Sequence, residues 1–124
     1  MRILLLILFG SIGTLARYWV GGVIQYRTGS SFPVGTLAIN LTGCFLLGGV
    51  GEYALQHISI SPDLRIGITV GFFGAFTTFS TFAYESSRML EDGDWMKMVL
   101  YASLSVVGGI LLGVTGIHLA DRIS

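Results

Sequence analysis

The residues with the most unusual chemistry in this chain lie together between Gly71 and Phe82, where the sequence reads Gly-Phe-Phe-Gly-Ala-Phe-Thr-Thr-Phe-Ser-Thr-Phe. Five phenyl rings and four hydroxyl groups share these 12 residues. The segment lies within a stretch from Ile66 to Tyr84 that carries no charged side chain. Helices that face lipid are rich in Leu and Ile. A segment of hydroxyls and rings is better suited to lining a space inside protein.

Such a segment offers weak anion binding without a fixed positive charge. A phenyl ring carries partial positive charge along its edge, and hydroxyl and amide groups donate hydrogen bonds. On an unbroken helix at about 100° per residue, the rings of Phe79 and Phe82 would lie opposite a face of hydroxyls formed by Thr77, Ser80, Thr81 and Tyr84. The alternative is that the rings only fill space between helices.

The same segment is a weak helix former. Gly74 and the β-branched Thr77 and Thr78 all lower helix propensity. A break here would release backbone carbonyl oxygens, which in hydrocarbon is tolerated only where protein or an ion satisfies them. Carbonyl oxygens are good ligands for a hard cation. We therefore expect the third membrane span to be broken in mid-membrane, and two copies that met at the break could share one ion.

Further polar side chains interrupt the other apolar segments. Asn40 could donate to an anion or make an interhelical hydrogen bond to backbone, and the sequence leaves both open. Tyr101 and Ser105 are four residues apart and share a helix face that either packs or lines a pathway. Arg17 either snorkels to an interface or supplies positive charge at a vestibule that attracts anions. The candidate donors to an anion are therefore Asn40, Ser80, Thr81, Tyr101 and Ser105.

The elements that must position these residues are membrane helices. The 124 residues are 52% hydrophobic and 11% charged, with a mean hydropathy of +0.77, which excludes an ordinary soluble domain. The first apolar stretch is too long for a signal peptide, and we interpret it as a retained span. A span needs roughly 20 apolar residues. We predict an all-α integral membrane protein with a single domain, 1–124, of four spans at about 3–25, 33–55, 64–89 and 95–119.

Apart from Arg17, which lies within the first span, the basic residues are divided evenly between the two sides of such a bundle. The side that holds the two termini carries Arg2, Arg65 and Arg122. The other side carries Arg27, Arg88 and Lys97. Orientation normally follows an excess of Lys and Arg on the cytoplasmic side, and here there is none. We therefore predict dual topology, with two opposite copies forming an antiparallel homodimer. The alternative is that factors which the count misses set one orientation.

Three segments of the chain, in this order, resemble the CrcB/Fluc family of fluoride channels, or fluoride exporters. They are Gly13-Thr14-Leu15-Ala16-Arg17-Tyr18, then Pro33-Val34-Gly35-Thr36-Leu37-Ala38-Ile39-Asn40-Leu41-Thr42-Gly43-Cys44-Phe45, then Gly71 to Phe82. The third segment is highly specific, and the four-span length fits the whole chain. The resemblance implies a passive, fluoride-selective channel with two pores per antiparallel dimer. It would export cytoplasmic fluoride across the bacterial plasma (inner) membrane and so relieve fluoride toxicity.

The resemblance also implies roles for individual residues along each pore. Phe79 and Phe82 would present ring edges to fluoride, and each pore would take one of them from each subunit. The amide of Asn40 would donate near the rings. Tyr101 and Ser105 would continue a polar track on the fourth span.

A second group of residues would act around this track. Ser80 and Thr81 would place hydroxyls beside it, and Arg17 would lie at a vestibule. The backbone carbonyls of Gly74 and Thr77 would bind a structural sodium ion at the dimer interface.

Two other functions fit a four-span chain. A small proton-coupled multidrug exporter would need a carboxylate deep in the membrane, but Glu52 and Glu85 lie near span ends, where we expect them to be solvated or paired. A non-transporting membrane scaffold would explain the glycines but not the segment from Gly71 to Phe82. We find no nucleotide-binding motif or redox centre, so we expect no enzyme activity and no nucleotide or nucleic-acid partner.

Overall fold

The computed structural model describes all residues from Met1 to Ser124, and its elements are all helices joined by short connections. Their order along the chain is α1 (Arg2–Thr28), α2 (Val34–Gln56), α3 (Pro62–Ile66), the π-helix η1 (Gly67–Phe73), α4 (Gly74–Phe76), α5 (Phe79–Glu91), α6 (Trp95–Ser103), the π-helix η2 (Leu104–Gly108) and α7 (Gly109–Ile123).

Four helical stretches are long and apolar enough to cross a membrane, so the prediction of an all-α chain with four such helices is confirmed. Their ends lie within four residues of the expected ones: Arg2–Thr28, Val34–Gln56, Pro62–Glu91 and Trp95–Ile123.

The helix ends follow local sequence signals. Gly29 has a φ of 58° and ends α1 in the left-handed conformation that glycine tolerates best. Pro62 begins α3, and the Ser61 hydroxyl accepts a hydrogen bond from the Leu64 N–H at 3.3 Å. Pro33, which we expected inside the second span, instead precedes α2, because its ψ of 64° is not helical.

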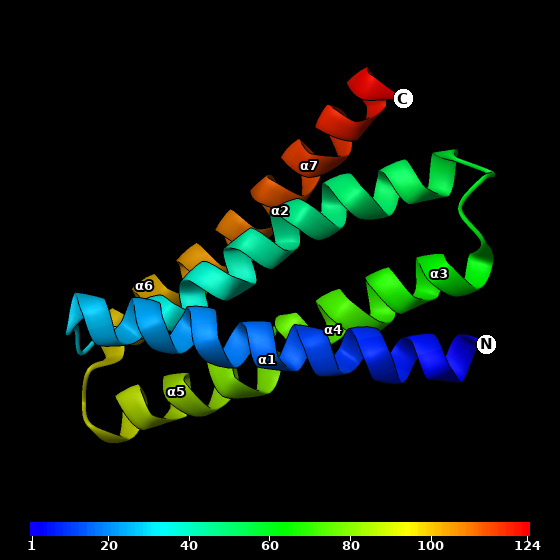
Figure 1. Cartoon of the computed structure of the whole chain (residues 1–124). Coiled ribbons are helices and arrows are strands. Elements are labelled where there is room, and N and C mark those ends of the chain that lie inside the picture. The colour runs from blue at the N-terminus through cyan, green and yellow to red at the C-terminus, as the bar shows by residue number, and fades with distance from the viewer.

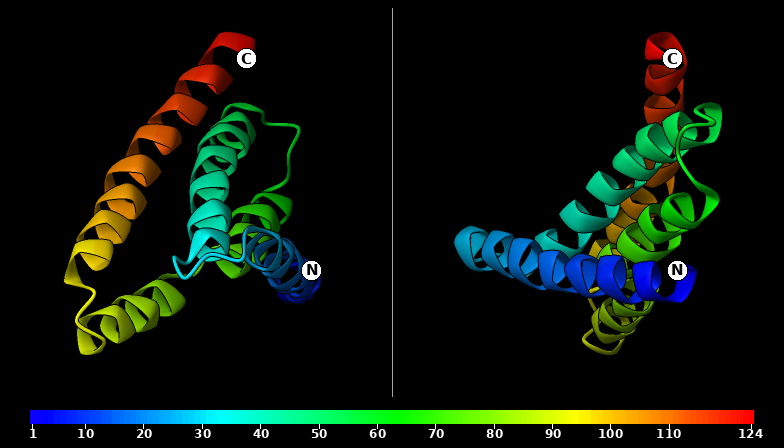
Figure 2. Two further views of the ribbon diagram at one scale, coloured as in Figure 1. Left: turned by 90° about the vertical axis from the view of Figure 1, so that its left-hand side faces the viewer. Right: turned by 45° about the vertical axis from the view of Figure 1, so that its right-hand side comes forward.

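The helices form an open bundle with connections at two opposite ends. Both termini and the α2–α3 connection lie at one end, and the α1–α2 and α5–α6 connections lie at the other (Figure 1). Helix α1 lies along α3, η1 and α4, whereas α2 packs against α7. Figure 2 shows α6 and α7 as one continuous rod, while α5 leaves the direction of α3 and α4.

Helices α2 and α7 approach each other through glycines. A Cβ atom on Gly48 would overlap the carbonyl oxygen of Gly113, so this contact requires a residue without a side chain. Small residues of this kind let membrane helices pack backbone to backbone. The glycines of the last span therefore serve helix packing within one chain.

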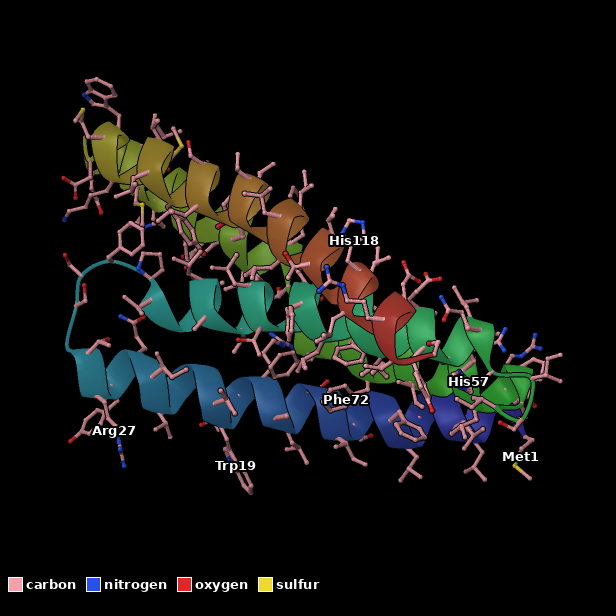
Figure 3. The ribbon with its side chains drawn as sticks, turned by 90° about the horizontal axis from the view of Figure 1, so that it is seen from above. Met1, Trp19, Arg27, His57, Phe72 and His118 are labelled. Atoms are coloured by element: carbon pink, nitrogen blue, oxygen red, sulfur yellow. The ribbon has the colours of Figure 1, made fainter.

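Much of the outer surface of the bundle is apolar. Trp19, which is 67% exposed, points away from the neighbouring helices (Figure 3). Extensive exposed apolar surface marks contact with a membrane or another protein. The buried apolar side chains are few by comparison: Ile39, Ala54, Phe73, Phe76, Met89, Tyr101 and Ala120.

Candidate functional site

The candidate site is centred on two extended residues between α4 and α5. Thr77 has φ −85° and ψ 157°, and Thr78 has φ −148° and ψ 114°. β-branched residues favour this conformation. Helix α5 then restarts with Thr78 as its cap, since the Thr78 hydroxyl accepts a hydrogen bond from the Thr81 N–H at 3.2 Å.

Asn40 of α2 supplies the hydrogen bonds that this stretch of backbone lacks. Its Nδ2 donates to the Thr78 carbonyl at 3.1 Å, and its Oδ1 accepts from the Thr78 N–H at 2.8 Å. Of the two roles left open by the sequence, the structure therefore shows the interhelical bond to backbone. An amide carries two N–H donors, so one N–H of Asn40 remains for another acceptor.

The carbonyl oxygens of Gly74 and Thr77 lose their helical partners at this point. In a continuous helix they would accept from the N–H groups of Thr78 and Thr81. These donors turn instead to Asn40 Oδ1 and Thr78 Oγ1. No cluster of His, Cys, Asp or Glu side chains in the chain could hold a metal ion. A cation here would depend on carbonyl oxygens, which suit a hard ion such as sodium.

A cavity of about 200 Å³ lies beside the extended residues. The rings of Phe79 and Phe82 line it, with centroids 5.6 Å apart. Ser105 also lines it, and the buried Oγ of Ser105 has no hydrogen-bond partner. Phe79 is 79% exposed, so its ring is only partly enclosed by its own chain. The full lining is Asn40, Cys44, Thr77, Thr78, Phe79, Phe82, Ser105 and Val106.

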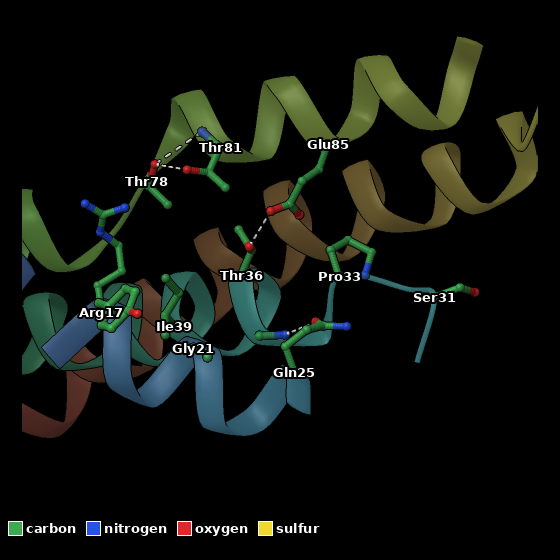
Figure 4. A pocket seen from close by; sticks show the side chains of 13 residues that line it. Arg17, Gly21, Gln25, Ser31, Pro33, Thr36, Ile39, Thr78, Thr81 and Glu85 are labelled. Atoms are coloured by element: carbon green, nitrogen blue, oxygen red, sulfur yellow. Dashed lines mark hydrogen bonds between the residues drawn. The ribbon is translucent and has the colours of Figure 1, made fainter. Parts of the chain in front are cut away.

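A second, more polar cavity of about 430 Å³ lies between α1, α2 and α5 (Figure 4). The half-buried Arg17 lines it, and its Nε donates to the Ala75 carbonyl at 3.0 Å. Arg17 thus turns inward to the end of α4 rather than outward to an interface. The cation also lies at a helix C-terminus, where the helix dipole favours positive charge.

Ser80 and Thr81, whose hydroxyls we predicted to lie beside the track, have different surroundings. Thr81 lines the larger cavity, and its Oγ1 accepts a hydrogen bond from Thr78 Oγ1 at 2.9 Å (Figure 4). Ser80 is exposed, lines neither cavity, and lies 3.4 Å from Thr78 Oγ1 through its Oγ. Ser80, Thr81 and Tyr84 all lie on the continuous helix α5, so of the hydroxyl face expected on an unbroken helix only Thr77, in the extended stretch, is separated.

Tyr101 reaches the carboxylate of Glu85, which we did not predict to belong to the site. Its fully buried hydroxyl donates to Glu85 Oε2 at 3.0 Å, and Thr36 Oγ1 donates to Glu85 Oε1 at 2.7 Å. Glu85 is paired, as expected, but with two hydroxyls of other helices. The Tyr101 ring lies 5.0 Å from the Phe82 ring, so this cluster adjoins the aromatic cavity.

Ser105 joins the site through an irregular turn. The π-helix η2 begins at Leu104, between Tyr101 and Ser105. Such turns are frequent at functional sites. Tyr101 faces Glu85, while Ser105 lines the cavity of Phe79 and Phe82. Tyr101 is therefore near Phe82 through its ring, and Ser105 is near Phe82 through the cavity that both residues line.

Four long apolar helices, with polar cavities beside two extended residues, define this chain as a multi-pass membrane protein. The family model described as CrcB-like protein, Camphor Resistance (CrcB), matches residues 4–117, and the chain belongs to this family. The predicted family is thereby confirmed.

Relatives cover nearly the whole chain. A protein from Geobacter sulfurreducens is 45% identical over 114 residues, which are 92% of this chain and 89% of the relative. One from Acidobacterium capsulatum is 46% identical over 123 residues, 99% of this chain and 98% of the relative. One from Geotalea daltonii is 45% identical over 105 residues, 85% of this chain and 82% of the relative. Each is named fluoride-specific ion channel FluC, and an ion channel is not an enzyme class.

Proposed function

We propose that this chain is a fluoride-specific ion channel that conducts fluoride passively. The relatives that cover most of its length carry that name. The observation that carries the proposal is the 200 Å³ cavity in which two phenyl rings, an amide and an unpartnered hydroxyl meet. These groups attract an anion without holding it as strongly as a fixed positive charge would.

The donors of this cavity would replace part of the water around fluoride. Asn40 is held by Thr78, so its remaining N–H is fixed in position. The buried Ser105 hydroxyl has no partner within the chain, so it would donate to an anion in the adjoining cavity. Edges of Phe79 and Phe82 would complete the coordination with weak contacts. Groups fixed in this way by the fold need little reorganisation when the ion arrives.

The more polar parts of the site would carry fluoride to and from the rings. Arg17 would attract anions into the 430 Å³ cavity, where Thr81 adds a hydroxyl and Ser80 lies nearby. Tyr101 would continue the track beyond Phe82, but its hydroxyl is bound to Glu85. Fluoride would therefore have to compete with the Glu85 carboxylate for that donor.

We further propose that two chains of opposite orientation form the channel as an antiparallel homodimer with two pores. Gly74 is exposed, and a Cβ atom placed on it would meet nothing within 4 Å, so the chain leaves open space at the start of α4. Phe79, which follows the two extended residues, is also exposed. A sodium ion bound by the freed carbonyls of Gly74 and Thr77 of both copies would hold the two breaks together in mid-membrane.

The membrane potential is sufficient to drive export. An inside-negative potential favours anion exit by roughly 2.3 kcal/mol per charge per 100 mV. We place the channel in the bacterial plasma membrane, where it would relieve fluoride toxicity. A proton-coupled exporter is less well supported, because Glu85, the carboxylate of the site, is bound by Thr36 and Tyr101 rather than open to a cationic drug.

The test is fluoride efflux from liposomes that contain the purified chain. Vesicles loaded with potassium fluoride and treated with valinomycin should release fluoride at a rate that follows the imposed potential and needs no pH gradient. Protein-free vesicles are the control. Fluoride release no faster than in the control, or release only when a pH gradient is imposed, would contradict the proposal.

A further inference from the structure

Gln25, near the end of α1, holds the connection between α1 and α2 through three hydrogen bonds. Its Nε2 donates to the carbonyls of Ser30 at 2.8 Å and Phe32 at 3.1 Å. Its Oε1 accepts from the Gly35 N–H at 2.9 Å (Figure 4). The first N–H groups of a helix have no partner within the helix, and the cap of α2, Pro33, offers no side-chain acceptor. Gln25 thus caps α2 from a neighbouring helix.

One of the residues that Gln25 holds, Phe32, contacts Tyr101. Phe32, whose carbonyl Gln25 binds, forms a T-shaped ring pair with Tyr101, with centroids 5.5 Å apart and an interplanar angle of 81°. The hydroxyl of Tyr101 donates to Glu85. Thr36, the other donor to Glu85, follows Gly35 directly in the first turn of α2. One amide therefore fixes both the ring beside Tyr101 and the helix start that carries Thr36.

The connection also lies at the boundary of two polar cavities. Gln25 lines the 430 Å³ cavity. A neighbouring cavity of about 280 Å³ contains Arg88 and Lys97. Ser31, Pro33 and Glu85 line both cavities. A shift of the connection would change the space on both sides of Glu85.

We propose that Gln25 is a positioning residue for ion conduction, which acts through Phe32 on the cluster of Tyr101, Glu85 and Thr36. Gln25 contacts none of the groups proposed to bind fluoride in the aromatic cavity. It sets the orientation of the Tyr101 hydroxyl by holding the connection in place. This inference rests on the proposed channel function, since conduction is what the positioning serves.

The decisive experiment is a double-mutant cycle on fluoride efflux from liposomes. Gln25→Met keeps the length of the side chain and removes its hydrogen bonds, so we expect efflux to fall about tenfold. Phe32→Ala should also lower efflux. Because Gln25 acts in part through Phe32, adding Gln25→Met to Phe32→Ala should lower efflux by much less than the tenfold expected in the wild-type background. Gln56→Met, at the exposed end of α2, is the matched control and should leave efflux unchanged.

A second variant separates the two functions of the amide. Gln25→Glu keeps the acceptor for the Gly35 N–H but loses the donors to Ser30 and Phe32, so it should lower efflux as Gln25→Met does. This variant also serves if Gln25→Met does not assemble. Dimer content, measured by size-exclusion chromatography, should stay at the wild-type level.

Three outcomes would overturn the inference. Wild-type efflux in Gln25→Met or Gln25→Glu would show that the amide positions nothing that conduction needs. Losses that multiply between Gln25→Met and Phe32→Ala would show that Gln25 does not act through Phe32. A wild-type chain that conducts no fluoride would instead contradict the proposed function itself, and this inference with it.

Discussion

Gly43 gives a sharp test of whether the extended residues control conduction. A Cβ atom on Gly43 would overlap Cγ2 of Thr77 and would lie 3.2 Å from Cδ1 of Phe76. Gly43→Ala should therefore push Thr77 out of its extended conformation. Overpacking of this kind costs about 1–3 kcal/mol, which corresponds to roughly 5- to 160-fold in the population of the conducting conformation. We expect fluoride efflux to fall by a factor in this range.

The same geometry specifies a compensating change. Thr77→Ser removes the Cγ2 methyl but keeps the hydroxyl that donates to the Phe73 carbonyl at 2.9 Å. The double variant Gly43→Ala/Thr77→Ser should recover most of the efflux that Gly43→Ala loses. Gly10→Ala is the control, because its Cβ would make an ordinary 3.8 Å contact and efflux should not change. Wild-type efflux in Gly43→Ala, or no recovery in a dimeric double variant, would refute the reasoning.

The remaining predictions concern the anion ligands and the dimer. Asn40→Ala removes two hydrogen bonds to Thr78, at about 1 kcal/mol each, and should slow fluoride efflux roughly 30-fold; efflux equal to wild type would contradict this. Phe79→Ile/Phe82→Ile should abolish efflux while size-exclusion chromatography still shows a dimer, and full efflux would exclude the rings as ligands. Gly74→Leu should keep the helical circular dichroism and lower the dimer fraction, whereas an unchanged dimer would show that Gly74 faces no second copy. Exchange of sodium for N-methylglucamine during assembly should also lower the dimer fraction, and indifference to sodium would count against the cation.

A weak point in the third span could be predicted at this segment because its cause is local. Gly74 and two successive threonines weaken a helix wherever they occur, and the structure has extended backbone at Thr77 and Thr78. The four long helices could also be predicted, since only the length of each apolar stretch is needed to recognise them. Predictions from local propensity and composition do not depend on how the neighbouring helices pack.

The contacts between helices could not be predicted in this way. From the sequence, Glu85 is only a residue near a span end. Nothing in the sequence shows that Thr36 and Tyr101 both donate hydrogen bonds to it. The π-helix at Leu104 changes which way Ser105 points, and no residue type signals it clearly. Gln25 had no recognisable pattern at all, since its role depends on the path of the α1–α2 connection. These features arise from how the helices cross and pack.

The most direct measurement of fluoride selectivity is a comparison of two anions in one preparation. Liposomes that contain the purified chain are loaded with equal concentrations of potassium fluoride and potassium chloride, and ion-selective electrodes record both effluxes after valinomycin is added. We predict that fluoride is lost rapidly, whereas chloride efflux stays close to that of protein-free vesicles. Comparable efflux of the two ions, or no fluoride efflux above the protein-free level, would contradict it.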